Sequence, residues 1–290
     1  MSMAQPTKRN IQIIDCPRDA MQGIKPFIPT EEKVAFLQNL LAIGFHTLDC
    51  GSFVSPRAIP QMRDTGEVIE QLDLDRTITK LLVIIANYRG AKTAVNYPQI
   101  TFLGFPFSIS ETFQLRNTNA TREEAFERIR EIQELASIHH KKLVVYFSMC
   151  FGNPYGDLWH PDIITYWANR FRDIGVRYIS LSDTTGIGEP EIIGQTVSAM
   201  KNNFSDIRFG VHLHTRQETW REKIQSAFDH GCDRFDGALK GFGGCPMAQD
   251  ELVGNMPTEN LISFFHEKNL FEYNQAALKE ALVMAQKIYT

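Results

Sequence analysis

Residues 142–149, Lys-Leu-Val-Val-Tyr-Phe-Ser-Met, form an almost unbroken apolar run, and residues 81–85, Leu-Leu-Val-Ile-Ile, form another. Strands of this composition are usually covered on both faces, as in a parallel sheet. Shorter runs of the same kind recur along the chain at fairly even spacing, which predicts eight strands. We expect these strands at 11–15, 47–50, 80–86, 100–107, 142–149, 178–183, 208–214 and 234–239.

Segments with helical periodicity separate the apolar runs. Two of them begin with a capping box, Thr121-Arg-Glu-Glu124 and Thr219-Trp-Arg-Glu222, which is typical of a helix start. Further helices are expected at 34–41, 58–72, 89–96, 161–173, 189–201 and 259–266. A last helix, at 274–289, follows the eighth unit and is expected to pack across one mouth of the barrel.

Eight strand–helix units in about 250 residues predict an α/β fold, a (β/α)8 TIM barrel over 11–267 with an additional C-terminal helix. A doubly wound open sheet is the alternative. It would normally carry a glycine-rich turn after its first strand, where this chain has Cys16-Pro17-Arg18-Asp19. No proline- or serine-rich linker divides the chain, so residues 1–290 are expected to form one domain.

The composition restricts the class of protein. The 290 residues are 43% hydrophobic and 22% charged, with a formal charge of −4. This balance favours a globular protein and argues against nucleic-acid binding, which would show as a basic face. No stretch reaches the roughly 18 apolar residues of a membrane helix, and the first ten residues lack the apolar core of a secretory signal. Five scattered cysteines do not make a disulfide framework, so we expect a cytoplasmic protein.

Functional groups of such a barrel lie at the C-terminal ends of its strands. His212 and His214 end the seventh predicted strand, and residues two apart on a strand point to the same face. Asp19 after the first strand offers a carboxylate, and Asn255 beyond the eighth offers an amide oxygen. This mixed set suits magnesium or manganese better than zinc. In the alternative reading, both histidines only pack at the mouth of the barrel.

Three more charged residues lie at the same predicted end. Arg18 is a permanent cation that could stabilise a developing enolate or carboxylate, or form a salt bridge to Asp49 or Asp183, or both. Asp183 is expected either as a general acid or base, or as the acceptor that orients a ligating histidine. Asp49 is expected as the partner that orients Arg18.

Residues 241–246, Gly-Phe-Gly-Gly-Cys-Pro, predict a flexible lid that carries the Cys245 thiol over the mouth. Glycines such as Gly243 and Gly244 permit a backbone that closes on a ligand. The thiol could act as a proton donor or nucleophile. The alternative is a buried small hydrophobic residue, which is the role expected for the other four cysteines.

These motifs resemble the 3-hydroxy-3-methylglutaryl-CoA lyase family. Residues 16–22, Cys-Pro-Arg-Asp-Ala-Met-Gln, are similar to the Gly-Pro-Arg-Asp-Gly-Leu-Gln opening of that family. Further similarities are Ser-Phe-Val-Ser-Pro-Arg at 52–57, Ser-Leu-Ser-Asp-Thr at 180–184, His-Leu-His at 212–214, Gly-Phe-Gly-Gly-Cys-Pro at 241–246 and Gly-Asn at 254–255. The resemblance spans about residues 11 to 266.

The resemblance implies a divalent-metal-dependent, homodimeric carbon–carbon lyase that cleaves 3-hydroxy-3-methylglutaryl-CoA to acetyl-CoA and acetoacetate. The implied metal ligands are Asp19, His212, His214 and Asn255. Arg18 would act at the substrate carbonyl and Cys245 as an acid on the lid. The remaining residues implied to line the site are Gln22, Ser52, Asp49, Asp183, Gly243 and Gly244.

The chain also departs from the family pattern. Thr-Arg-Gln at 215–217 replaces the usual Asp-Thr-Tyr-Gly, Asp49 stands where glutamate is usual, and no cysteine follows Cys245. The alternatives are therefore a lyase or aldolase for another 3-hydroxyacyl-CoA, and an acyl-CoA-condensing synthase. A catalytically dead barrel that serves as a binding module is disfavoured, because the expected ligands, Arg18 and Cys245 are all present.

Overall fold

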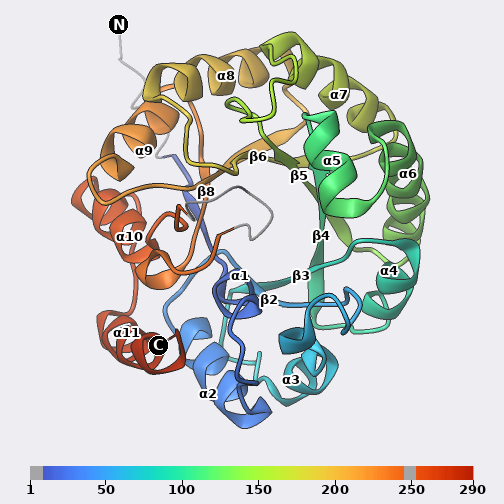
Figure 1. The fold of residues 1–290 in the computed structure, drawn as a ribbon. Helices are drawn as coiled ribbons and strands as arrows, with labels where there is room; N and C mark the ends of the chain where they lie inside the picture. Colours follow the sequence, from blue (N-terminus) through green and yellow to red (C-terminus); the bar gives the residue numbers. More distant parts are fainter. Residues whose placement is uncertain (1–8, 245–252, 290) are drawn as a thin grey trace, which may run out of the picture.

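The computed structural model describes residues 9–244 and 253–289. Eight parallel strands close into a barrel in chain order, with β1 paired to both β2 and β8 (Figure 1). This confirms the prediction of a (β/α)8 barrel. The strands are β1 (Gln12–Asp15), β2 (Thr47–Ser52), β3 (Lys80–Ile84), β4 (Ile100–Ser108), β5 (Lys142–Ser148), β6 (Tyr178–Asp183), β7 (Arg208–Leu213) and β8 (Arg234–Gly237).

Helices surround the barrel as an outer ring (Figure 1). They are α1 (Pro17–Gln22), α2 (Thr30–Leu41), α3 (Thr65–Gln71), α4 (Tyr88–Ala94), α5 (Glu111–Thr118), α6 (Arg122–Ile138), α7 (Pro161–Asp173), α8 (Pro190–Asn203), α9 (Trp220–Asp229), α10 (Thr258–Glu267) and α11 (Gln275–Tyr289). Two 3₁₀ turns, η1 (Pro60–Met62) and η2 (Leu239–Gly241), complete the described elements. No helix among them is long and apolar enough to cross a bilayer.

The structure differs from the expected helices at several points. The segment 58–72 splits into η1 and α3, because the Thr65 hydroxyl bonds the Met62 carbonyl and receives the Ser52 amide, which ties the start of α3 to the end of β2. The capping box at Thr121 forms with both of its hydrogen bonds. The predicted box at Thr219 does not form, because its hydroxyl bonds the Arg216 carbonyl instead. The short helices α1 and α5 were not expected.

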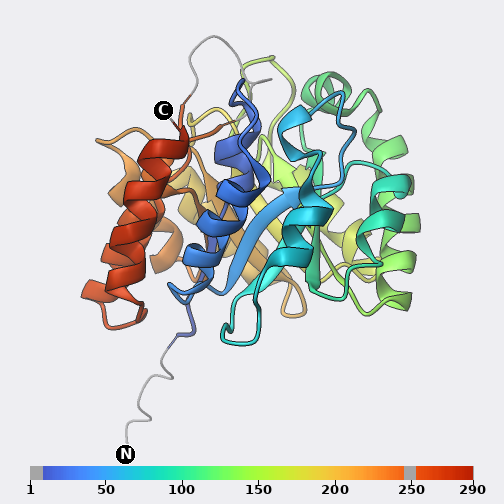
Figure 2. The ribbon, with the colours of Figure 1, turned by 90° about the horizontal axis from the view of Figure 1, so that it is seen from below.

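The C-terminal helix is present, but the expectation that it packs across a barrel mouth is wrong. It runs along the outside of the barrel beside α2 (Figure 2). The ring of Tyr289 packs edge-on against Phe36 of α2 at 5.8 Å and against Phe242 at 5.1 Å. The apolar side of α11 therefore fills the outer ring, and only its end reaches the mouth.

Side chains alternate along each strand between the helix layer and the barrel interior. The large apolar core lies between strands and helices. A small apolar cluster, Leu82, Phe102 and Val144, fills the interior, with Tyr146 packed against it. The interior also holds polar groups: the Ser180 hydroxyl donates to Asp236, which is level with His212 in the register of β7 and β8. The C-terminal half of the barrel is thus lined by polar side chains.

Candidate active site and metal centre

The first turn after β1 holds a fixed guanidinium. Arg18 of α1 donates to Asp49 Oδ2 from Nε at 3.0 Å and from Nη2 at 2.5 Å, and its Nη1 donates to Asp19 and Gln22 at 3.0 Å. Burial lowers the pKa of Arg18, but the Asp49 and Asp19 carboxylates more than offset it, so the net shift is upward and the cation is retained. As expected from the sequence, Asp49 orients Arg18.

Asp19 lies between this cation and the turn that follows β8. Its Oδ1 accepts from Gln22 Nε2 at 2.7 Å, and its Oδ2 accepts from Asn255 Nδ2 at 2.6 Å and from the Gly244 amide at 3.3 Å. Burial raises the pKa of Asp19, but the charge of Arg18, the neighbouring His212 and the bond from Asn255 outweigh it, and the pKa is lowered. The carboxylate is therefore ionised at neutral pH.

The glycines of the predicted lid are required by this close approach. Gly243 has a φ of +91°, and a Cβ there would lie 2.7 Å from Asn255 Nδ2 and 2.9 Å from the Asp19 carbonyl oxygen. Asn255 Nδ2 also donates to the Phe242 carbonyl at 2.8 Å. The backbone of 242–244 therefore passes directly over the two oxygen-bearing side chains. Cys245 lies outside the described residues.

The two histidines approach the same region from β7. Their ring centroids are 5.5 Å apart, and Nδ1 of His212 lies 3.4 Å from Asp236 Oδ2. Burial, and after it the neighbouring His212, lower the pKa of His214 to about 3. His214 is therefore a neutral imidazole at pH 7, the form that donates a lone pair to a metal.

The residues present fit a divalent cation. Asn255 Oδ1 is buried and accepts no hydrogen bond, although buried acceptors are normally satisfied. It adjoins an ionised carboxylate, and the imidazoles of neutral His214 and of His212 complete a nitrogen and oxygen donor set of the kind that magnesium or manganese accepts. Burial lowers the pKa of His212, but Asp236 and Asp19 outweigh it and the pKa is raised. The sequence-predicted ligands are therefore brought to one region.

Asp183 ends β6, as predicted, and its carboxylate pairs with Lys223. Its Oδ2 accepts from Lys223 Nζ at 2.8 Å, and both of its oxygens accept from the Gly188 amide at 3.1 Å. The Lys223 ammonium also donates to the carbonyls of Gly186 at 2.8 Å and His214 at 3.2 Å. Ser180, three residues earlier on β6, bonds Asp236 inside the barrel, so the alternation of the strand turns Asp183 toward α9. Its described contacts make it a partner of Lys223, which supports the His214 backbone, and give it no bond to a histidine ring.

Ser52 is buried at the end of β2, and its hydroxyl accepts from the Val54 amide at 3.1 Å. The Ser52 oxygen is thus already engaged, and the hydroxyl proton is available to donate a hydrogen bond to a substrate. Gln22 is held by Arg18 and Asp19. The structure thus places Gln22 against the candidate ligand Asp19, and Ser52 at the end of β2, the strand that carries Asp49.

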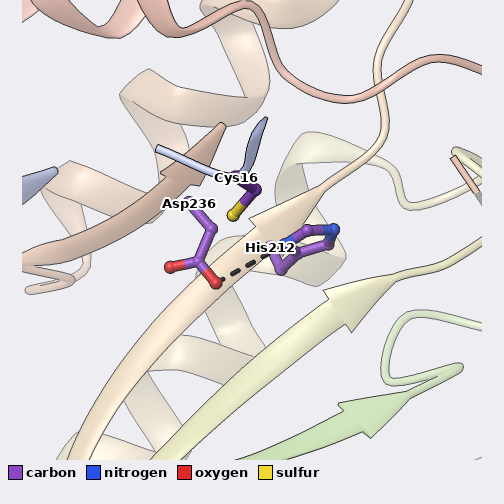
Figure 3. A group of neighbouring side chains, drawn as sticks. All are labelled: Cys16, His212 and Asp236. Carbon is purple, nitrogen blue, oxygen red and sulfur yellow. Dashed lines mark ion pairs between the residues drawn. The ribbon is translucent and has the colours of Figure 1, made fainter. Parts of the chain in front are cut away.

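Sequence reasoning missed a second set of donors beneath the histidines. Within the described residues, ligand atoms of Cys16, His212 and Asp236 all lie within 4.8 Å of one another (Figure 3). Asp19, His212 and His214 do not form such a group. Arg234 and Asp236 are two apart on β8, and this polar alternation in a strand is the signal that could have revealed Asp236 from the sequence.

Comparisons with known proteins place these features in context. The HMGL-like family model matches residues 10–286. The mitochondrial hydroxymethylglutaryl-CoA lyase of Macaca fascicularis is 30% identical over 257 residues, which are 88% of this chain and 78% of the relative. The cytoplasmic 3-hydroxy-3-methylglutaryl-CoA lyase of Rattus norvegicus is 31% identical over 250 residues, which are 85% of this chain and 71% of the relative.

A solved structure shows the same architecture. The HMG-CoA lyase of Acinetobacter baumannii, in complex with coenzyme A and 3-methylmalate, aligns with a TM-score of 0.90 and 27% identity. The alignment covers 99% of this chain and 93% of that one. The similarity therefore extends over the whole barrel.

Proposed function

The chain belongs to the HMGL-like family, and we propose that it cleaves 3-hydroxy-3-methylglutaryl-CoA to acetyl-CoA and acetoacetate by a retro-aldol reaction. The observation that carries the proposal is the cluster at the C-terminal mouth. There, Arg18 is held rigidly by Asp49 and lies beside Asp19, whose other oxygen bonds Asn255. A fixed cation next to a set of oxygen and nitrogen donors suits a reaction that develops an enolate.

We propose that a magnesium or manganese ion is held by Asp19, His212, His214 and Asn255. When bound, such an ion polarises the substrate oxygens and makes the tertiary hydroxyl more acidic. The unsatisfied Asn255 Oδ1 and the neutral His214 support this assignment.

The residues of the chain have separate roles in the proposed reaction. A base takes the proton of the tertiary hydroxyl, the bond between C2 and C3 breaks, and C3 becomes the ketone of acetoacetate. The electron pair of that bond passes to C2 as the thioester enolate, whose negative charge Arg18 stabilises. Cys245 then protonates C2 to give acetyl-CoA. Because Asp183 pairs with Lys223, we do not assign the base to Asp183.

We assign the substrate contacts from the places that these residues occupy in the structure. Gln22, Ser52, Gly243 and Gly244 surround the charged cluster and are assigned to acyl-group binding. An acyl-CoA substrate is supported by the coenzyme A complex of the Acinetobacter relative. We further propose that residues 1–290 work as one lyase domain, in the cytoplasm and as a homodimer. Fractionation of cells tests the cytoplasmic location, and sedimentation of the purified protein tests the homodimer.

The deciding experiment is product analysis. Purified protein is incubated with 3-hydroxy-3-methylglutaryl-CoA and either magnesium or manganese, and acetoacetate and acetyl-CoA are measured. We expect equal amounts of both products, and no reaction after chelation. Related 3-hydroxyacyl-CoA thioesters are tested in parallel. Cleavage of one of these without any acetoacetate from the expected substrate would show that the acyl group is assigned wrongly.

A further inference from the structure

The barrel interior below the candidate metal centre contains donors that the proposed lyase reaction does not use. They are the Cys16 thiol, Nδ1 of His212 and the Asp236 carboxylate (Figure 3). Cys16 follows β1, His212 belongs to β7 and Asp236 to β8, and closure of the barrel makes these strands neighbours. Figure 3 shows the ion pair between Asp236 and His212, with the Cys16 sulfur beside it.

The hydrogen bonds around these donors leave capacity for a ligand. Asp236 is 2% exposed, and its Oδ1 has no hydrogen-bond partner. Its Oδ2 receives one bond, from Ser180 at 3.2 Å. His212 Nδ1 lies 3.4 Å from Oδ2 but is not aligned for a hydrogen bond. A buried carboxylate and a half-buried imidazole therefore meet beside a buried thiol at ion-pair distance, without a hydrogen bond between them.

We propose that Cys16, His212 and Asp236 form a second cation site, which takes a thiophilic divalent ion such as Zn²⁺ or Cd²⁺. Thiolate, imidazole and carboxylate are the ligands of zinc, whereas the oxygen-rich donors above suit magnesium or manganese. The proposal rests on the donors that the structure brings together and does not depend on the lyase assignment.

The distances are compatible with coordination. A tetrahedral zinc ion places neighbouring nitrogen, oxygen and sulfur ligands about 3.3–3.6 Å apart. His212 Nδ1 and Asp236 Oδ2 already meet this separation at 3.4 Å, and all three ligand atoms lie within 4.8 Å. The ligand atoms that are still up to 4.8 Å apart would have to approach each other by about 1 Å, which a small side-chain rotation can provide. Binding releases the thiol proton and leaves one ligand position for a water molecule.

The charges of the ligands and of their neighbours also permit a divalent ion to bind at this site. A thiolate and a carboxylate balance the two charges of the ion. Two cations lie nearby. Arg234 Nη1 lies 3.4 Å from Asp236 Oδ1, on the side away from the oxygen that faces His212, and the charge of Arg18 acts on both Cys16 and His212. The side chain of His212 is 13% exposed, while Cys16 is 1% exposed. An ion would therefore enter from the mouth, past the imidazole.

The shared histidine makes the two sites exclusive. A neutral imidazole carries one proton and one lone pair. An ion on Nδ1 leaves the proton on Nε2, which then has no lone pair for the centre that contains Asp19 and His214. We therefore infer that a thiophilic ion in the lower site displaces magnesium or manganese from the upper one.

The first test uses metal-free protein titrated with Cd²⁺, and measures the ultraviolet absorption that a cadmium–thiolate bond produces. We expect one equivalent to give the band in the wild type and in Cys50→Ser, a buried thiol elsewhere in the core that serves as the matched control. In Cys16→Ser the band should be lost and Cd²⁺ affinity reduced at least about tenfold. Circular dichroism shows whether the variants are folded, and Asp236→Asn provides a second variant that keeps the thiol and should weaken Cd²⁺ binding.

The second test measures Mn²⁺ release by electron paramagnetic resonance as Cd²⁺ is added. Cd²⁺ should displace Mn²⁺ from the wild type at one equivalent, and Cys16→Ser should keep its Mn²⁺. A band that persists in Cys16→Ser would overturn the site, and Mn²⁺ that stays bound while the band saturates would overturn the exclusivity. The band does not require turnover, so failure of the lyase assay leaves this result readable.

Discussion

Gly243→Ala tests whether the close passage of the backbone over Asp19 and Asn255 sets the geometry of the metal centre. The added Cβ would lie 2.9 Å from the Asp19 carbonyl oxygen, where ordinary contact begins at 3.4 Å. Either Asp19 or the glycine backbone must therefore move by about 0.5 Å. Since a displacement of about 1 Å at a reacting centre lowers the rate by about 10²-fold, this shift should lower turnover by about tenfold.

The variant also adds backbone strain, which has to be separated from the displacement. Gly243 has a φ of +91°, and an L side chain in this region costs about 1–2 kcal/mol. Gly156→Ala is the matched control, because Gly156 has a φ of +74° and nothing lies within 4 Å of its added Cβ. It should lose a similar amount of stability without any change in metal binding.

Two measurements decide the outcome. Calorimetric titration of the metal-free proteins with Mn²⁺ gives the affinity, and initial rates at saturating substrate and metal give turnover. We expect Gly156→Ala to match the wild type in both, and Gly243→Ala to lose about tenfold in each. Wild-type affinity and turnover in Gly243→Ala would show that the lid backbone does not position Asp19 and Asn255.

Four further outcomes follow from the same contacts. His214→Ala should lower Mn²⁺ affinity by more than about tenfold and its activity should recover only partly at high metal; full activity in metal-free protein would refute the metal mechanism. Cys245→Ser should lower turnover by about 10²–10⁴-fold with little change in Mn²⁺ affinity, and near-wild-type turnover would remove the thiol from the mechanism. Lys223→Met leaves the buried Asp183 carboxylate unpaired, so the free energy of unfolding in urea should fall by about 3–5 kcal/mol. The double variant, Lys223→Met with Asp183→Asn, should recover part of this loss. An equal loss in the single and the double variant would contradict the pairing. Burial lowers the pKa of His46 to about 4, so the unfolded chain takes up a proton between its ordinary pKa and pH 4 while the folded chain does not. Stability should therefore fall as pH falls through this window, and His46→Gln should flatten the dependence of the melting temperature on pH. The same slope of melting temperature against pH in the wild type and in His46→Gln would contradict this role of His46.

The barrel and the shared face of its two strand histidines were determined by local sequence. Apolar runs such as 81–85 and 142–149 become strands covered on both faces because nearly every residue in them is apolar. The pair His212 and His214 shares a face because side chains on a strand repeat every two residues. Both inferences depend only on neighbours in the chain, and the structure agrees with both.

The tertiary structure alone decided which face each strand turns inward. On β6 the alternation sends Ser180 into the barrel and Asp183 to Lys223, and a strand buried on both sides carries no local signal for this choice. The same holds for α11, whose apolar side indicates a packed helix but not that α2 is its partner.

The meeting of Cys16, His212 and Asp236 depends on closure of the barrel. His212 is level with Asp236 in the register of β7 and β8, and Cys16 follows two residues after Ile14, the register partner of Asp236 on β1. That register is set by the tilt and stagger that eight strands need in order to close, which is a property of the whole sheet. A donor set contributed by both ends of the chain is therefore not determined until the last strand pairs with the first.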